Sequence, residues 1–206
     1  MKIGTIKAEA LKLMYLTGSD TVEAEDIETL ESEENLRPYL FAMTGAINRC
    51  LSDIEARRIL PTKTKRIEER EGGSVVLSLS DITDFYDVER VSAAVSGEYR
   101  GNVSFFTEGD SLIIPNADAD AAYTLLYHPK ISRLSGNEWN TAELEGIPDA
   151  VACLIPYYIK GELYREDEPN EAGEARNWYE SGRALIRPVR DGVQNRVCTV
   201  YSQVML

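Results

Sequence analysis

The chain has 206 residues, of which 43% are hydrophobic and 28% charged; this globular balance excludes wholesale disorder and a fibre. The net charge of -13 argues against a general binder of nucleic acid or of anionic membranes, which needs a surplus of Lys and Arg. No apolar run approaches the ~20 residues that cross a bilayer. The three cysteines are odd in number and far apart in sequence, which favours free thiols in a reducing compartment.

Two helices are predicted in the first 62 residues. Ile6, Ala10 and Leu13 follow helical spacing, so we expect a short amphipathic helix over residues 4–16. A longer helix is expected to start at a cap provided by Asn35 and to stop before Pro61. Its buried stripe consists of Leu36, Leu40, Met43, Ile47, Cys50, Leu51 and Ile54.

An acidic segment separates these helices. Residues 19–34 hold eight acidic side chains and no basic one, which favours a solvated connector. The alternative is a loose helix held to the protein by Val22, Ile27 and Leu30.

The middle of the chain has the period of β-strands. Apolar and polar residues alternate over 75–79, 91–95, 103–105 and 123–127, a short apolar run occupies 112–114, and turns with Gly or Asp intervene. Short strands at this spacing predict a small antiparallel sandwich or barrel.

Helical spacing returns near Ile147. Pro156 lies inside this apolar pattern and should kink or restart the helix. Pro169 then opens a last helix that ends before Pro188. One face of that helix is expected to carry Ala172, Ala175, Tyr179 and Leu185.

These patterns predict an α+β fold with three parts. The helices of residues 1–62 and 135–188 form one discontinuous bundle, because neither group can bury its apolar stripe alone. Residues 63–134 form an inserted antiparallel β-domain, and residues 189–206 form an extended C-terminal tail. The tail has a net charge of +1, whereas residues 1–61, 62–134 and 135–188 carry -4, -4 and -6.

The sequence carries no recognisable catalytic, cofactor-binding or metal-binding motif. His128 is the only histidine, and we expect it to be solvent-facing or at a strand end before Pro129. Asn116, Asp118 and Asp120 alternate as in a calcium loop. The glycine and glutamate that such a loop needs are missing, so a plain turn is predicted. We therefore predict no catalytic residue, cofactor or metal.

Aromatic side chains gather in the two C-terminal helices. Core packing is the simpler interpretation, and interface anchoring is the alternative, since Tyr and Trp are enriched at binding hot spots. The residues are Tyr157, Tyr158, Tyr164, Trp178 and Tyr179.

The tail is the segment most suggestive of a partner. Fully extended, the chain from Val193 to Leu206 would reach ~46 Å. It can return as an edge strand of the chain's own β-domain or fray, or it can add to another subunit or insert into a partner. The predicted partner-binding residues are Arg190, Arg196, Val197, Val200, Tyr201, Val204, Met205 and Leu206.

Residues 154–180, LIPYYIKGELYREDEPNEAGEARNWYE, carry a resemblance to a known family. The match extends over about residues 147–187 and resembles the C-terminal helical pair of tailed-phage head–tail connector proteins, the adaptor or head-completion proteins of the neck. The resemblance implies a structural virion protein without catalysis, assembled in the host cytoplasm and located at the head–tail junction.

The resemblance further implies a ring of about twelve copies beneath the portal, closed by head-to-tail contacts. Its C-terminal tail would dock on the portal protein, and its other side would meet the next neck or tail component. Double-stranded DNA would pass through the ring without specific binding, since an acidic channel repels phosphates. The β-block of about seventy residues favours the larger adaptors, whose β-domain faces the tail.

Two other functions stay open. One is a different neck or tail-completion component that binds the tail tube instead of the portal. The other is an enzyme or ligand-binding module with a carboxylate site in the β-domain.

Overall fold

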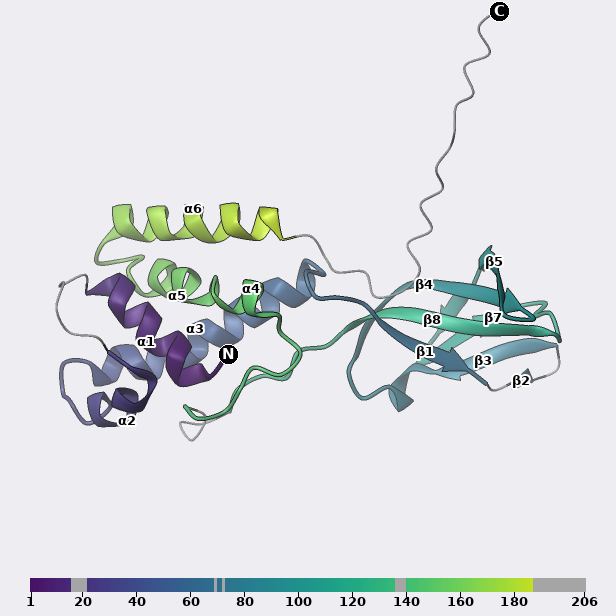
Figure 1. Cartoon of the computed structure of the whole chain (residues 1–206), viewed down its shortest axis with the longest axis horizontal. Helices are drawn as coiled ribbons and strands as arrows, with labels where there is room; N and C mark the ends of the chain where they lie inside the picture. The colour runs from purple at the N-terminus through teal and green to yellow at the C-terminus, as the bar shows by residue number, and fades with distance from the viewer. Residues whose placement is uncertain (16–21, 69, 72, 136–139, 187–206) are drawn as a thin grey trace, which may run out of the picture.

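The structure is a computed structural model that describes residues 1–15, 22–68, 70–71, 73–135 and 140–186 (Figure 1). Its helices are α1 (Ile3–Met14), α2 (Ile27–Leu30), α3 (Arg37–Ala56), α4 (Asp149–Ala152), α5 (Ile155–Leu163) and α6 (Pro169–Leu185), with 3-10 turns η1 (Ala24–Asp26) and η2 (Leu79–Asp81). Its strands are β1 (Lys63–Ile67), β2 (Arg70–Glu71), β3 (Ser74–Ser78), β4 (Phe85–Val95), β5 (Glu98–Asn102), β6 (Phe106–Glu108), β7 (Ser111–Ile114) and β8 (Ala121–Pro129).

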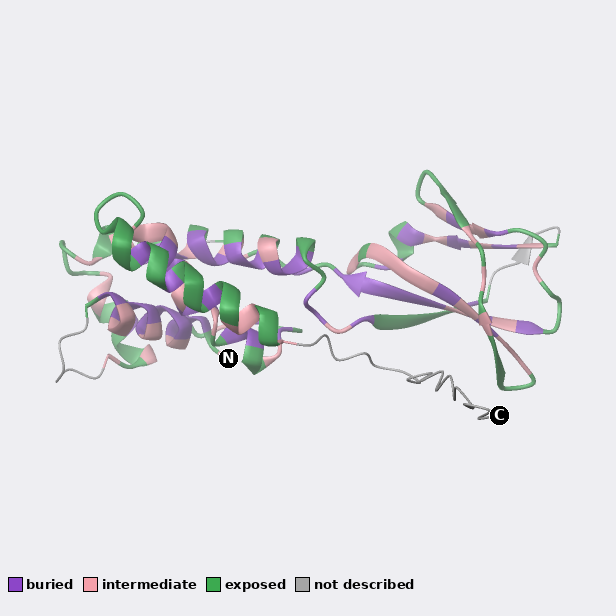
Figure 2. Cartoon of the chain, turned by 90° about the horizontal axis from the view of Figure 1, so that it is seen from above, coloured by how far each residue is buried: buried purple, intermediate pink, exposed green. Residues whose placement is uncertain are grey.

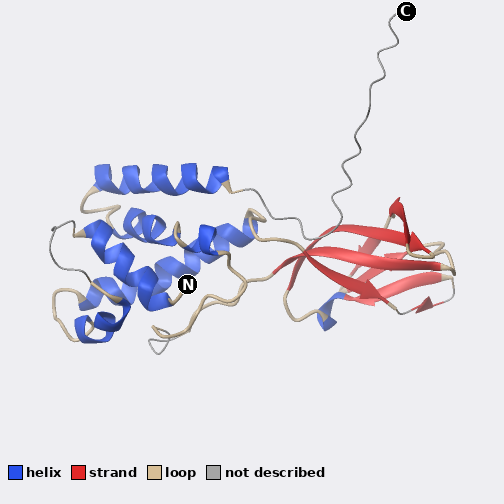
Figure 3. Ribbon diagram, viewed as in Figure 1, coloured by secondary structure: helices blue, strands red, loops and turns tan. Residues whose placement is uncertain are grey.

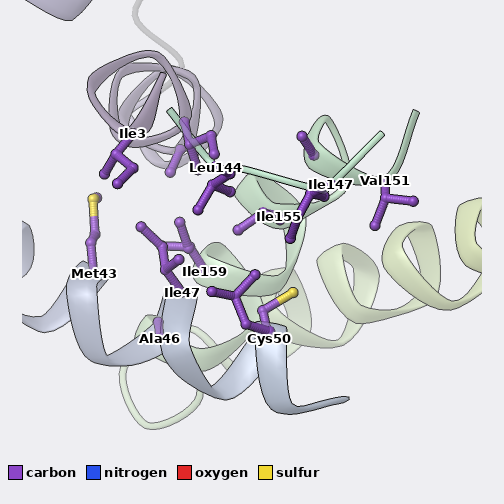
Figure 4. Close-up of a cluster of buried hydrophobic side chains, with 14 of the residues drawn as sticks. Ile3, Met43, Ala46, Ile47, Cys50, Leu144, Ile147, Val151, Ile155 and Ile159 are labelled. Carbon is purple, nitrogen blue, oxygen red and sulfur yellow. The ribbon is translucent and has the colours of Figure 1, made fainter. Parts of the chain in front are cut away.

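The predicted α+β class with antiparallel sheets is confirmed. The α-helices gather at one end of an elongated molecule and the strands at the other (Figures 1 and 3). A helical core draws buried side chains from both ends of the chain, including Ile3, Ile47 and Ile155, which converge in Figure 4. A separate sheet core lies wholly between Ile67 and Tyr127.

The longest helix, α3, follows its apolar stripe. Six of the seven predicted stripe residues, from Leu40 to Ile54, are buried in the helical core. Pro38 lies in the first turn, where backbone N–H groups have no partner within the helix, so its missing N–H costs no helical hydrogen bond. The predicted cap is wrong: Leu36 occupies the cap position and no side chain caps the helix there, while the Arg37 N–H donates to the Glu33 carbonyl at 2.9 Å.

The acidic segment is anchored to the helical core. Ile27 is fully buried and begins α2, which is a single helical turn. In the 3-10 turn before it, the Glu23 backbone N–H donates to the Asp26 carboxylate at 2.8 Å. The prediction of a solvated connector is therefore wrong for residues 24–30, and the anchored helix that was its alternative is present. Burial of Ile27 favours this position, and Glu31 pairs with the buried Lys7 of α1 at 3.3 Å, while Glu25, Asp26 and Glu28 stay exposed.

The strands form two four-stranded antiparallel sheets. Their strand orders are β1-β8-β4-β5 and β2-β3-β7-β6, and their inner faces enclose the sheet core. The predicted strand over residues 103–105 is wrong. This stretch is the link between β5 and β6, in which the Val103 N–H bonds to the Val91 carbonyl at 2.9 Å. Val103 and Phe105 still pack on the sheet core, which explains their alternation without a strand.

The C-terminal helices bear out two predictions and correct one. Pro156 lies at the start of α5, so the helix restarts there after α4. Ala172, Ala175 and Tyr179 form the buried stripe of α6, but Leu185 is 83% exposed. Six residues of helix rotate Leu185 about 120° away from Tyr179, which removes it from the stripe.

No helix in the described ranges combines the length and the apolar character that crossing a membrane requires.

Candidate interaction surfaces

The C-terminal helical pair is fastened to the end of α1. The Lys160 ammonium donates to the Leu13 carbonyl at 2.7 Å, and the Tyr164 hydroxyl donates to the Met14 carbonyl at 2.7 Å. Carbonyls at a helix C-terminus lack partners within the helix, so these side chains complete the end of α1. Glu171 of α6 lies 2.8 Å from the same ammonium and ties the second helix of the pair to this point.

A second fastening joins α6 to α3. The Tyr179 hydroxyl donates to the Asp53 carboxylate at 2.8 Å, and Arg57 holds that carboxylate from the other side at 2.6 Å. Burial and the neighbouring Cys50 and Asp53 raise the pKa of Tyr179 above its ordinary value of 10. Burial raises the pKa of Cys50 to about 12, so this thiol stays protonated near neutral pH.

Glycines bring α5 and α6 close together. A Cβ on Gly161 would meet the Arg176 side chain at 2.9 Å, and a Cβ on Gly182 would meet Leu154 at 2.5 Å. Arg176 in turn pairs with Glu162 of α5 at 2.5 Å. The pair is thus a closely packed unit, and its outward face has a fixed shape.

That outward face carries exposed apolar side chains. Trp178 is 60% exposed and rests its ring on Tyr157, with centroids 6.4 Å apart. Leu185 stands at the last turn of α6, and Figure 2 shows the exposed side of this helix. The aromatic cluster is therefore divided: Tyr179 is core, packed edge-on against Tyr158, whereas Trp178 is available to a partner.

A polar cluster marks the junction of helices and sheets. Arg58, two residues after the end of α3, pairs with Asp87 of β4, and the buried Glu55 of α3 pairs with Arg133.

His128 lies near the end of β8, as predicted, but it is only 8% exposed, so the solvent-facing alternative is wrong.

Burial at the junction determines the protonation of the His128 imidazole. Burial lowers the pKa of His128 and Arg58 acts in the same direction, while Glu89, 3.5 Å from Nε2, and Asp87 oppose them. The net effect keeps the imidazole neutral near neutral pH.

Two further polar clusters of the sheet region are structural. Asp84 accepts from Lys63 at 2.5 Å and from the Tyr127 hydroxyl at 2.9 Å, which links β1 and β8 to the turn before β4. The predicted turn at Asn116–Asp120 is confirmed, with the Asp120 N–H donating to Asp118 at 3.0 Å. Within the described ranges, no group of three or more His, Cys, Asp or Glu side chains is placed to hold a metal ion.

The residues predicted to bind a partner all lie in the tail, outside the described residues: Arg190, Arg196, Val197, Val200, Tyr201, Val204, Met205 and Leu206. Their role stays a prediction. Sequence reasoning missed the outward faces of the two sheets, whose composition becomes visible only when strand register is known.

No model of a known protein family matches this chain, and neither does any curated protein.

Proposed function

We propose that this chain is a structural virion protein, a head–tail adaptor that forms a ring beneath the portal. In this proposal the helices at both chain ends act as one bundle, the strands form a β-domain inserted into it, and residues 189–206 are the docking tail. The single observation that carries it is the helical pair α5–α6, which bears the connector-like sequence, is fastened to α1 and α3, and precedes the tail in sequence.

The hydrogen bonds that hold α5 and α6 on α1 and α3 suit a docking element that must keep a fixed position relative to the helical core. Tyr179, Lys160 and Tyr164 hold the pair on two other helices, so a tail that follows Leu185 starts from a rigid base. Trp178 and Leu185 are exposed on the last two turns of α6 and would add apolar contacts to a docked partner. The mildly basic tail complements an acidic partner surface.

The acidic body suits a passage for DNA. A net charge of -13 per copy, repeated around a ring, repels phosphates and lets a duplex move without sticking. In this arrangement the portal, the next neck or tail component and further copies of the chain are its protein partners, at the head–tail junction of the virion.

The test is affinity capture from an infected or induced lysate with the full chain and with a truncation after Gly192, with bound proteins identified by mass spectrometry. We expect the full chain to recover a portal protein and the truncation to lose it while keeping the circular dichroism of the full chain. Equal recovery by both chains would remove the tail from docking. Recovery of tail-tube proteins alone would make the chain another neck or tail-completion component.

A further inference from the structure

The outward face of the first sheet is poor in charge over the half that lies far from the helices; the next row toward the helices, Thr64–Leu126–Arg90, adds one arginine. Along β4 and β8 the inward residues are buried, so the residues between them point away from the core. Two adjacent cross-strand rows define what we call face A: Tyr99–Ala94–Ala122, and Asn102–Ser92–Thr124–Arg66. The Tyr99 hydroxyl donates to Asn102 at 3.1 Å, which lays its ring along this face.

The outward face of the second sheet has a matching pattern. Val75, Leu77, Leu112 and Ile114 point into the sheet core, so their neighbours point outward. Two adjacent rows define face B: Phe106–Ile113–Val76, and Glu108–Ser111–Ser78. The Phe106 side chain is 48% exposed and is not part of the sheet core.

The two faces have the same order of rows and opposite charges. In both sheets the apolar row lies farther from the helices than the polar row, since Asp87 of β4 and η2 after β3 mark the near end of each sheet (Figure 3). The only charged side chain in the rows of face A is Arg66, and the only one in face B is Glu108. Opposite charges beside uncharged apolar rows are the composition of a protein–protein contact.

The sheet edges are poor alternatives for association. β1 is an outer strand that presents Lys63, Lys65 and Arg66, and lysine-rich edges oppose strand addition. The β5 edge is bent by a register shift opposite Ala93 and Ala94, and β6 has only three residues. The faces are therefore better suited to association than the β1, β5 and β6 edges.

We propose that face A of one copy binds face B of a second copy of this chain. The faces lie on opposite sides of one sandwich, so the contact is head-to-tail and repeats from copy to copy in a common orientation. Phe106 and the Ile113–Val76 row of one copy meet Tyr99 and the alanine row of the next. This inference rests on the ring of the proposed function and names the surfaces that build it.

The experiment uses the full chain and two variants, Ala122→Glu in face A and Phe106→Glu in face B, measured by sedimentation velocity over a wide concentration range. We expect the natural sequence to form oligomers and each variant alone to be monomeric, because every contact needs one intact face of each kind. An equal mixture of the two variants keeps one compatible pair of faces and should form a 1:1 dimer.

Tyr86→Glu is the matched control, since Tyr86 is an exposed aromatic of β4 that belongs to neither face. It should oligomerise as the natural sequence does, and circular dichroism should be the same for all four chains. A monomeric natural sequence, an oligomeric single variant or a mixture without dimer overturns the inference. A chain that captures the portal but stays monomeric contradicts this inference alone, and one that oligomerises through these faces without recovering a portal contradicts the proposed function alone.

Discussion

The helical region and the sheet region are stabilised in different ways. The helical core joins residues distant in sequence. Its long-range hydrogen bonds come from side chains such as Tyr164 and Tyr179 and from a short backbone pairing, in which the Ile3 N–H donates to the Ala142 carbonyl at 2.9 Å. The sheet core is complete between Ile67 and Tyr127, and its strands are joined by backbone ladders. The first region needs both ends of the chain, whereas the second is closed locally and leaves its outer faces free.

The largest effects should come from the two cores. Leu51→Ala in the helical core and Leu125→Ala in the sheet core each remove a fully buried side chain, and each should cost about 2–5 kcal/mol. Differential scanning calorimetry will show whether the cores unfold separately. We expect two transitions, with Leu51→Ala lowering one and Leu125→Ala lowering the other; a single transition shifted by both variants would contradict separate cores.

A smaller effect is expected at a close helix contact. A Cβ on Gly4 of α1 would lie 2.9 Å from the Asn140 carbonyl and 3.1 Å from that of Ala24, both backbone atoms. Gly4→Ala should therefore destabilise the helical region by about 1–3 kcal/mol. Gly173→Ala is the matched control on α6, where the added methyl meets open space and should stabilise by about 0.5–1 kcal/mol. Urea unfolding measures both, and effects of the same sign would refute this packing.

Hydroxyl deletions compare the two regions next. Tyr179→Phe removes a bond to Asp53 in the helical region, and Tyr127→Phe removes a bond to Asp84 in the sheet region. Each should lower the free energy of unfolding by about 1–2 kcal/mol. Tyr86→Phe is the exposed control and should change nothing measurable. If Tyr179→Phe behaved like that control, the α6–α3 fastening would be energetically unimportant.

The smallest effect should appear at the junction, as a function of pH. Because the folded pKa of His128 lies below the ordinary 6.5, its contribution to stability is complete above pH 6.5 and is lost as the pH falls through the lower folded value. NMR titration of this one imidazole gives the folded pKa directly. His128→Gln should flatten the stability profile in that window, and a folded pKa above 6.5 would reverse the predicted sign.

The sequence predicted the helices better than the strands for a physical reason. The stripe from Leu40 to Ile54 is set by the helix period alone, so α3 could be placed without knowing its neighbours. Register between strands depends on the partner strand, and this hid both the link at residues 103–105 and the outward faces. The strand-end position of His128 was predicted but its burial was not, because the junction beside it brings in residues distant in sequence such as Arg58.

The most direct test of the adaptor proposal is cryo-electron microscopy of the neck of the particle that contains this chain. We predict a closed ring of this chain directly beneath the portal, with residues after Gly192 in contact with the portal and the sandwich pointing toward the tail. A position on the tail tube, or a neck without this chain, would contradict the proposal.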